Sequence, residues 1–131
     1  MIITRTPLRI SFAGGGSDLK EYYLKYGGSV LSTSIDKYIY LSMHPYFNAN
    51  KYFLKYSRNE LVDNVNDIDH KIIKQVFKDY NILGVDFNSS ADIPSGTGLG
   101  SSSSFTVGLT QLCNTYNSKY MNLEEIAKYA C

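Results

Sequence analysis

The protein has 131 residues, of which 44% are hydrophobic and 19% are charged, and its formal net charge is +1. This length and composition fit one soluble globular domain with a hydrophobic core. The near-neutral charge excludes a global field that would draw the chain to nucleic acid or to an anionic membrane, so we expect neither as a partner. Any recognition of phosphate must therefore be local.

The sequence carries no strong signal for export, membrane insertion or metal binding. No run approaches the roughly 18 apolar residues of a membrane span, and the first residues lack the basic region and apolar stretch of a secretion signal. Cys113 and Cys131 have neither Cys-x-x-Cys nor Cys/His spacing, so we expect reduced, structural thiols without zinc or a disulfide. These features predict a cytosolic protein.

The chain begins with a predicted strand and a short helix. Residues 2–12 alternate polar and apolar side chains around Pro7, which predicts an extended segment with an edge position or a break at the proline. Ser17 or Asp18 is expected to cap a helix over residues 20–26, and the two glycines that follow would end it.

The middle of the chain predicts antiparallel strands and then a helix. The strands are expected over residues 30–35, 38–43 and 51–56, which are rich in β-branched and aromatic side chains. Residues 67–80 have apolar side chains at helical spacing and acidic residues at the start. His70 lies near that start, where we expect it to cap the helix or to join a surface ion pair, with no catalytic role.

A strand, a glycine loop and a helix follow in that order. The strand is predicted over residues 84–93, and a helical pattern runs over residues 101–117. Asn122 and Glu125 resemble a capping box at the start of a last helix. Because the sequence stops inside that helix, we expect a fragment or a truncated product.

The loop between this strand and helix has the strongest chemical signal. Gly96, Gly98 and Gly100 alternate with other residues, so the backbone can take positive φ and approach a ligand closely. The helix that follows adds free N–H groups and a positive dipole end, and residues 101–104 add four serine hydroxyls. This construction fits a di- or triphosphate.

Two common phosphate loops do not match. The Walker A pattern needs a lysine directly after its last glycine, and the dinucleotide pattern needs two residues between its second and third glycines. This loop has no such lysine, and only one residue separates its last two glycines. The plain structural alternative is a flexible turn before a serine-rich helix cap.

Two motifs resemble those of the GHMP kinases, named for galactokinase, homoserine kinase, mevalonate kinase and phosphomevalonate kinase. The segment Pro94-x-Gly96-x-Gly98-Leu99-Gly100-Ser101-Ser102 resembles the family's phosphate-binding motif, and residues 6–18 resemble its first motif. Within the family, residues 12–19, residues 27–37 and Ile68-x-His70 look like D-glycero-D-manno-heptose 7-phosphate kinases. The resemblance covers nearly the whole chain.

This resemblance implies a two-domain α+β kinase whose N-terminal domain is a ribosomal-protein-like layer of sheet and helices. Residues 1–131 would form that ATP-binding domain, incompletely, without the C-terminal domain. The cofactors implied are ATP and Mg²⁺, with Ser102 as a metal ligand, while Ser103 and Ser104 would pack or cap. The phosphate-binding residues implied are Pro94, Gly96, Thr97, Gly98, Leu99, Gly100, Ser101 and Ser102.

The first motif would hold the sugar or sugar phosphate. The resemblance implies that Gly15, Gly16, Ser17 and Asp18 contact the substrate, and that Arg9 lies near the reacting hydroxyl as a catalytic residue. A helix cap at Asp18 and a surface salt bridge at Arg9 are the plainer alternatives. The family's catalytic aspartate is expected after residue 131, so the isolated chain should be nearly inactive.

The function implied is transfer of phosphate from ATP to the anomeric hydroxyl of D-glycero-D-manno-heptose 7-phosphate, a step toward nucleotide-activated heptose for surface polysaccharide. A fucokinase or galactokinase type of kinase stays open, as does a nonenzymatic anion-binding or assembly module. An RNA-binding domain is disfavoured by the near-neutral charge. A homodimer is left open as well.

Overall fold

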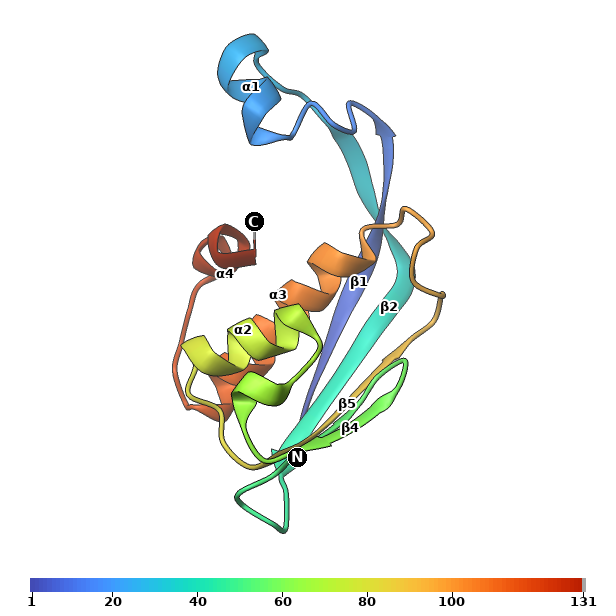
Figure 1. Ribbon diagram of the computed structural model, residues 1–131. Helices are drawn as coiled ribbons and strands as arrows, with labels where there is room; N and C mark the ends of the chain where they lie inside the picture. Colours follow the sequence, from blue (N-terminus) through green and yellow to red (C-terminus); the bar gives the residue numbers. More distant parts are fainter. Residues whose placement is uncertain (131) are drawn as a thin grey trace.

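Five strands form one mixed sheet in the computed structural model of the protein, which describes residues 1–130 (Figure 1). In space the strands follow the order β1-β2-β5-β3-β4, and α2, α3 and α4 lie on one side of the sheet, while α1 projects beyond its end (Figure 1). The elements are β1 (Ile2–Ala13), α1 (Lys20–Tyr26), β2 (Leu31–Pro45), β3 (Tyr52–Lys55), β4 (Asn59–Val62), a 3-10 turn η1 (Val65–Asp67), α2 (Lys71–Asp79), β5 (Val85–Ala91), α3 (Ser101–Tyr116) and α4 (Leu123–Ala130). The α+β class predicted from the sequence is confirmed.

Strand β1 is an edge strand, as its proline predicted. Pro7 lacks an N–H group, which an edge position tolerates, and the pairing of β1 with β2 shifts register between Pro7 and Arg9. The Pro7 carbonyl still has a partner, because the Ser104 hydroxyl on α3 donates to it at 2.9 Å. This contact ties β1 to the first turn of α3.

The two strands predicted over residues 30–35 and 38–43 are one continuous strand, β2, so that prediction was wrong. Pro7 pairs with Tyr38 but Arg9 pairs with Ser34, so β2 carries extra residues across this step. Such a bulge absorbs the polar pair at residues 36–37 without ending the strand. The middle of the chain is also not purely antiparallel, because β3 runs parallel to β5, and β4 was not predicted.

Both helix starts in the first half differ from the prediction. Leu19 occupies the N-cap of α1 and gives no side-chain cap, so neither Ser17 nor Asp18 caps this helix. Helix α2 begins at Lys71 with no acidic residue in its first turn, and the acidic residues that precede it belong to η1 and to a loop. The predicted C-cap glycine of α1 is confirmed, since Gly27 has a φ of 73°.

The starts of the last two helices agree with the sequence. Helix α3 begins at Ser101, directly after Gly100. Asn122 and Glu125 form the expected capping box: the Asn122 side chain accepts from Glu125 N–H at 2.9 Å, and the Glu125 carboxylate accepts from Asn122 N–H at 2.8 Å. These two residues lie close in sequence, which is why the pattern could be read directly.

The hydrophobic core lies between the sheet and helices α2 and α3. Burying each large apolar side chain there stabilises the fold by about 1.5–3 kcal/mol. Fully buried members include Leu41, Met43, Leu54, Ile73, Phe77, Val85, Phe87, Leu109 and Leu112. Because α3 is anchored in this core, its N-terminal turn has a fixed position beside β1.

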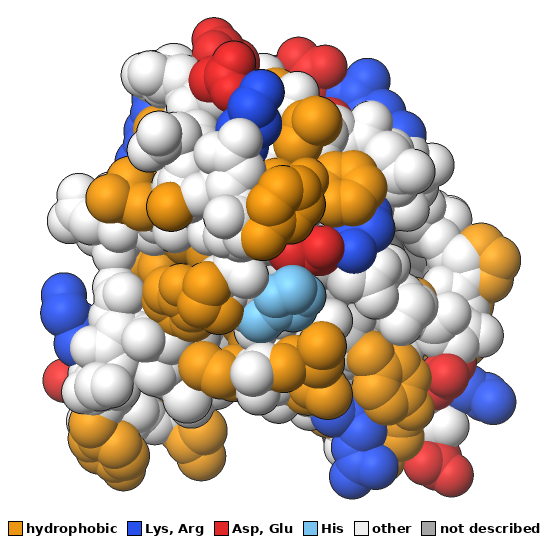
Figure 2. Space-filling model, turned by 90° about the horizontal axis from the view of Figure 1, so that it is seen from below, with side chains coloured by type: hydrophobic (Ala, Val, Ile, Leu, Met, Phe, Trp, Pro, Cys, Tyr) orange, Lys and Arg blue, Asp and Glu red, His pale blue; other side chains and the backbone are white. Residues whose placement is uncertain are grey.

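Other hydrophobic side chains stay exposed at the end of the molecule that holds the N-terminus and the β2–β3 loop (Figures 1 and 2). Among them, Met1 is 79% exposed, Phe47 is 90% exposed and Leu83 is 70% exposed. No helix within residues 1–130 has the length and apolar character needed to cross a bilayer.

Candidate active site

The glycine loop lies between β5 and α3 and has the backbone that its spacing predicted. Gly96, Gly98 and Gly100 have φ angles of 82°, 74° and 71°, which are left-handed values that favour glycine. A Cβ atom on Gly96 or Gly98 would meet no other atom within 4 Å. The backbone at these two residues therefore borders open space that a ligand can approach.

The serines after the loop divide into two pairs. Ser103 donates to Gly100 O at 3.0 Å and Ser104 donates to Pro7 O at 2.9 Å, so both pack or cap as expected. Ser101 and Ser102 instead line a cavity beside the loop. The amides of the first helical turn have no intrahelical acceptor, so they and the two free hydroxyls form a donor set for an anion.

Arg9 connects this loop to β1. Its backbone N–H donates to Leu99 O at 3.1 Å, and its guanidinium donates from Nη1 to Ser11 Oγ. Arg9 forms no ion pair with another residue in the described range 1–130, so the surface salt bridge is not its role there. The Arg9 side chain therefore lies between the glycine loop, at Gly100, and Ser11 of β1.

Ser17 holds the first glycine motif against the segment before β2. Its hydroxyl lies 2.7 Å from Gly14 O and 2.9 Å from Ser29 O, and it accepts from Ser29 N–H at 3.1 Å. Gly14 is required at this junction, because a Cβ atom there would lie 1.9 Å from Ser29 O. These contacts fix the loop that presents Asp18.

Asp18 faces a cavity of about 350 Å³ between this loop and the start of β2. One carboxylate oxygen accepts from Gly16 N–H at 3.0 Å. Tyr23 and Ser29 also line the cavity, so an aromatic ring, a hydroxyl and a carboxylate converge there. Unlike Gly14, Gly15 has open space where a Cβ atom would be.

The loop-side cavity, which lies beside the glycine loop, has a volume of about 480 Å³. Its walls are Ile39, His70, Ile72, Ser89, Ala91, Ile93, Ser95, Gly96, Ser101, Ser102 and Phe105. Five of these side chains are apolar and five are polar, a mixture that a small-molecule site with an apolar wall and a few placed polar groups requires. Sequence reasoning assigned none of the residues from β2, α2 and β5 to a site, and Ile68-x-His70 was the only signal that pointed to this wall.

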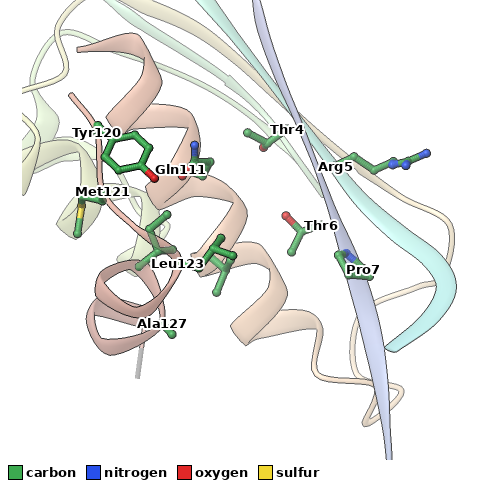
Figure 3. Close-up of a pocket in the computed structure, with 11 residues that line it drawn as sticks. Thr4, Arg5, Thr6, Pro7, Gln111, Tyr120, Met121, Leu123 and Ala127 are labelled. Carbon is green, nitrogen blue, oxygen red and sulfur yellow. The ribbon is translucent and has the colours of Figure 1, made fainter. Parts of the chain in front are cut away.

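A third cavity, of about 510 Å³, lies between β1, α3 and α4 (Figure 3). Thr4 and Thr6 point toward α3, whereas Arg5 points away from the cavity (Figure 3). Apolar side chains of α4 and the segment before it, including Met121, Leu123 and Ile126, complete the walls. With its one cation directed outward, this cavity is less suited to phosphate than the loop-side cavity.

Within residues 1–130, no group of three or more His, Cys, Asp or Glu side chains could hold a metal ion. Ser102 would offer Mg²⁺ one hydroxyl oxygen, although this ion takes six oxygen ligands and commonly includes a carboxylate and phosphates. Ser102 would therefore supply at most one of the oxygen ligands that Mg²⁺ needs.

The comparisons with known proteins bear on the family and the fold of the chain. The family described as GHMP kinases N terminal domain matches residues 67–131. The D-glycero-alpha-D-manno-heptose 7-phosphate kinase of Campylobacter jejuni is 32% identical over 98% of this chain and 42% of its own length. Residues 67–131 thus belong to the GHMP kinase N-terminal domain family.

Solved structures share the fold of this chain. A crystal structure of a D-glycero-D-manno-heptose 1-phosphate kinase from Bacteroides thetaiotaomicron is 22% identical, with a TM-score of 0.85 over 99% of this chain and 46% of that chain. The mevalonate kinase of Methanococcus jannaschii is 24% identical, with a TM-score of 0.75 over 98% of this chain and 44% of that chain. The chain thus spans less than half the length of the relatives it matches.

Proposed function

We propose that the chain forms the ATP-binding part of a sugar kinase, incomplete within residues 1–131. The kinase would transfer the γ-phosphate of ATP to the anomeric hydroxyl of D-glycero-D-manno-heptose 7-phosphate. The observation that carries this proposal is the loop at the N-terminus of α3, where Gly96 and Gly98 border open space at positive φ. Backbone amides in such a loop can approach phosphate oxygens closely.

Each residue of the loop has a role in the proposal. The backbone from Pro94 to Gly100, with Thr97 and Leu99 between the glycines, wraps the ATP phosphates. Ser101 and Ser102 add hydroxyls at the first helical turn, where the dipole favours negative charge. Ser102 also supplies one ligand to Mg²⁺, which when bound neutralises charge that develops on the phosphates.

The first glycine motif takes the acceptor sugar. Asp18 accepts hydrogen bonds from sugar hydroxyls, and the face of Tyr23 packs against C–H groups of the ring in the same cavity. Gly15 and Gly16 allow close approach of the backbone, and Ser17 positions the loop through its contacts with Gly14 and Ser29. The 32% identity to a heptose 7-phosphate kinase supports this choice of sugar.

Arg9 acts between the two sites. The anomeric oxygen attacks the γ-phosphorus, the bond between that phosphorus and the bridging oxygen breaks, and ADP leaves with the bond electrons. The guanidinium of Arg9 stabilises charge near the reacting hydroxyl. The hydroxyl proton goes to a base that family resemblance places after residue 131, so residues 1–131 alone should be nearly inactive.

Binding of ATP to the loop can be tested by calorimetry in the presence of Mg²⁺. Gly98→Val should weaken ATP binding at least tenfold, since the new side chain fills the space that phosphates would occupy. Gly27→Val is a matched control: Gly27 has a φ of 73° and open space at its Cβ position, but it ends α1. Equal affinities for ATP in the two variants, both folded by circular dichroism, would contradict the proposal.

The acceptor can be tested with a sugar panel in a version of the protein as long as its relatives. Heptose 7-phosphate should turn over faster than galactose or fucose, and Asp18→Asn should raise the KM for the sugar more than the KM for ATP. Faster turnover of fucose or galactose would contradict heptose 7-phosphate as the substrate, but it would still support a sugar kinase. Tight anion binding without any phosphotransfer would favour a nonenzymatic module.

We also propose that the protein acts in the cytosol, because its ligands ATP and sugar phosphate are small soluble metabolites. The net charge of +1 does not favour binding to nucleic acid or to an anionic membrane. A homodimer stays a prediction.

A further inference from the structure

His70 lines the loop-side cavity together with Gly96, Ser101 and Ser102. We propose that His70 contacts the nucleobase of a bound nucleoside triphosphate, donating a hydrogen bond from Nε2 to a ring nitrogen or carbonyl of the base. This inference rests on the proposed function, because it takes the phosphates to lie on the neighbouring loop.

The cavity has the two-part character that a nucleotide requires. At one side lie the loop residues Ser95 and Gly96 and the serines that open α3, where phosphates would bind. Apolar side chains, among them Ile72, Ile93 and Phe105, form much of the remaining wall, which also includes the polar Ser89. A flat base buries its faces against apolar groups and its edge needs a few placed polar groups. His70 supplies a polar edge there.

The His70 ring is held in place by packing. Its centroid lies 5.0 Å from that of Tyr56, in an edge-on arrangement, and 5.3 Å from that of Phe105. Its Nδ1 accepts from Ile73 N–H at 3.4 Å, which caps α2. A ring positioned in this way loses little conformational freedom when a ligand binds.

The residue before His70 is anchored as well. Asp69 N–H donates to the buried Glu60 carboxylate at 3.0 Å, and the Asp69 carboxylate pairs with Arg58 at 2.6 Å. Glu60 in turn accepts from the Tyr56 hydroxyl, and Arg58 lies 3.4 Å from Glu60. This network fixes the backbone from which His70 extends.

The protonation of His70 suits a donor. Because Nδ1 accepts a hydrogen bond, the proton of the neutral ring is assigned to Nε2. Burial lowers the pKa of His70, and the nearby charges of Glu60 and Arg58 act on this pKa in opposite directions. The ring is therefore neutral near pH 7, and within residues 1–130 its Nε2–H has no hydrogen-bond partner and could meet an acceptor on a base.

A role limited to capping α2 predicts a different result from a base contact. Capping needs only an acceptor at the position of Nδ1, which an asparagine side chain also supplies. His70→Asn therefore keeps the cap but loses the aromatic ring and the Nε2–H donor. His44→Asn is the matched control, since His44 is the other histidine and lies outside the cavity.

The experiment compares ATP with inorganic tripolyphosphate, both with Mg²⁺, by calorimetry. His70→Asn should weaken ATP binding about tenfold and leave tripolyphosphate binding unchanged, whereas Gly98→Val should weaken both. Unchanged ATP binding by folded His70→Asn would overturn the inference and leave the phosphate loop intact. If the unmodified chain bound neither ligand, the proposed function would fail and the inference with it.

A second measurement follows the histidine itself. In a spectrum of ¹⁵N-labelled imidazole groups, ATP should shift the Nε2 signal of His70, and tripolyphosphate should not. The His44 signals serve as an internal reference. Equal shifts of the His70 signal with both ligands would mean that it responds to phosphate alone, which would overturn the base contact.

Discussion

The side chain of Arg9 lies directly against Gly100. A Cβ atom at Gly100 would lie 2.9 Å from Arg9 Cγ and 3.2 Å from Arg9 Nε. The Arg9 backbone also donates to the neighbouring Leu99 carbonyl at 3.1 Å. The loop that would hold ATP phosphates and the strand that leads to the sugar motif are therefore packed as one unit.

This packing distinguishes Gly100 from Gly96. Both residues have positive φ, but only Gly100 lacks room for a Cβ atom. We expect Gly96→Ala to lower the free energy of unfolding by about 1–2 kcal/mol through backbone strain, and Gly100→Ala by about 2–4 kcal/mol, since overpacking adds to the strain. Urea unfolding measures both, and equal losses would show that Arg9 moves aside without cost.

Gly108 in α3 should reverse the usual preference for alanine in a helix. Replacing a glycine inside a helix by alanine normally stabilises it by about 1 kcal/mol. Here a Cβ atom would lie 2.6 Å from Thr6 Oγ1 and 3.3 Å from Leu41 Cδ1, so Gly108→Ala should destabilise by about 1–3 kcal/mol. In urea unfolding, adding Thr6→Ala should recover part of that loss, and a stabilising Gly108→Ala would contradict the packing.

The lowered pKa of His70 should make stability depend on pH. The unfolded state binds a proton near pH 6.5, while the folded state resists it because the ring is buried. The free energy of unfolding should therefore fall as the pH drops from about 7.5 to about 5, and this part should be missing in His70→Asn. A constant difference in stability between the two proteins across that range would argue against a buried, neutral His70.

Cys113 should resist thiol reagents in the folded protein. Its side chain is fully buried in α3, and burial raises the pKa of the thiol to about 12. In a Cys131→Ser variant, which leaves Cys113 as the one cysteine, labelling should be more than ~10³-fold slower than for an unfolded peptide. Fast labelling under native conditions would mean that α3 opens locally.

Much of the candidate site could be predicted because its signals are local. Alternating glycines at residues 96, 98 and 100 demand positive φ, and each has it. The Asn122–Glu125 capping box and the edge position of Pro7 likewise depend on a few neighbouring residues and on the chemistry of proline. For such features the sequence alone determined the backbone.

The sequence alone left other features open, because they depend on residues far apart in the chain. Ser17 was expected to cap α1, but its hydroxyl contacts Ser29 instead, and no local pattern encodes that choice. The same holds for the parallel pairing of β3 with β5 and for the loop-side cavity, where His70 meets Phe105. Only packing of the sheet against α2 and α3 brings these side chains together, so the tertiary structure decided which residues surround the loop.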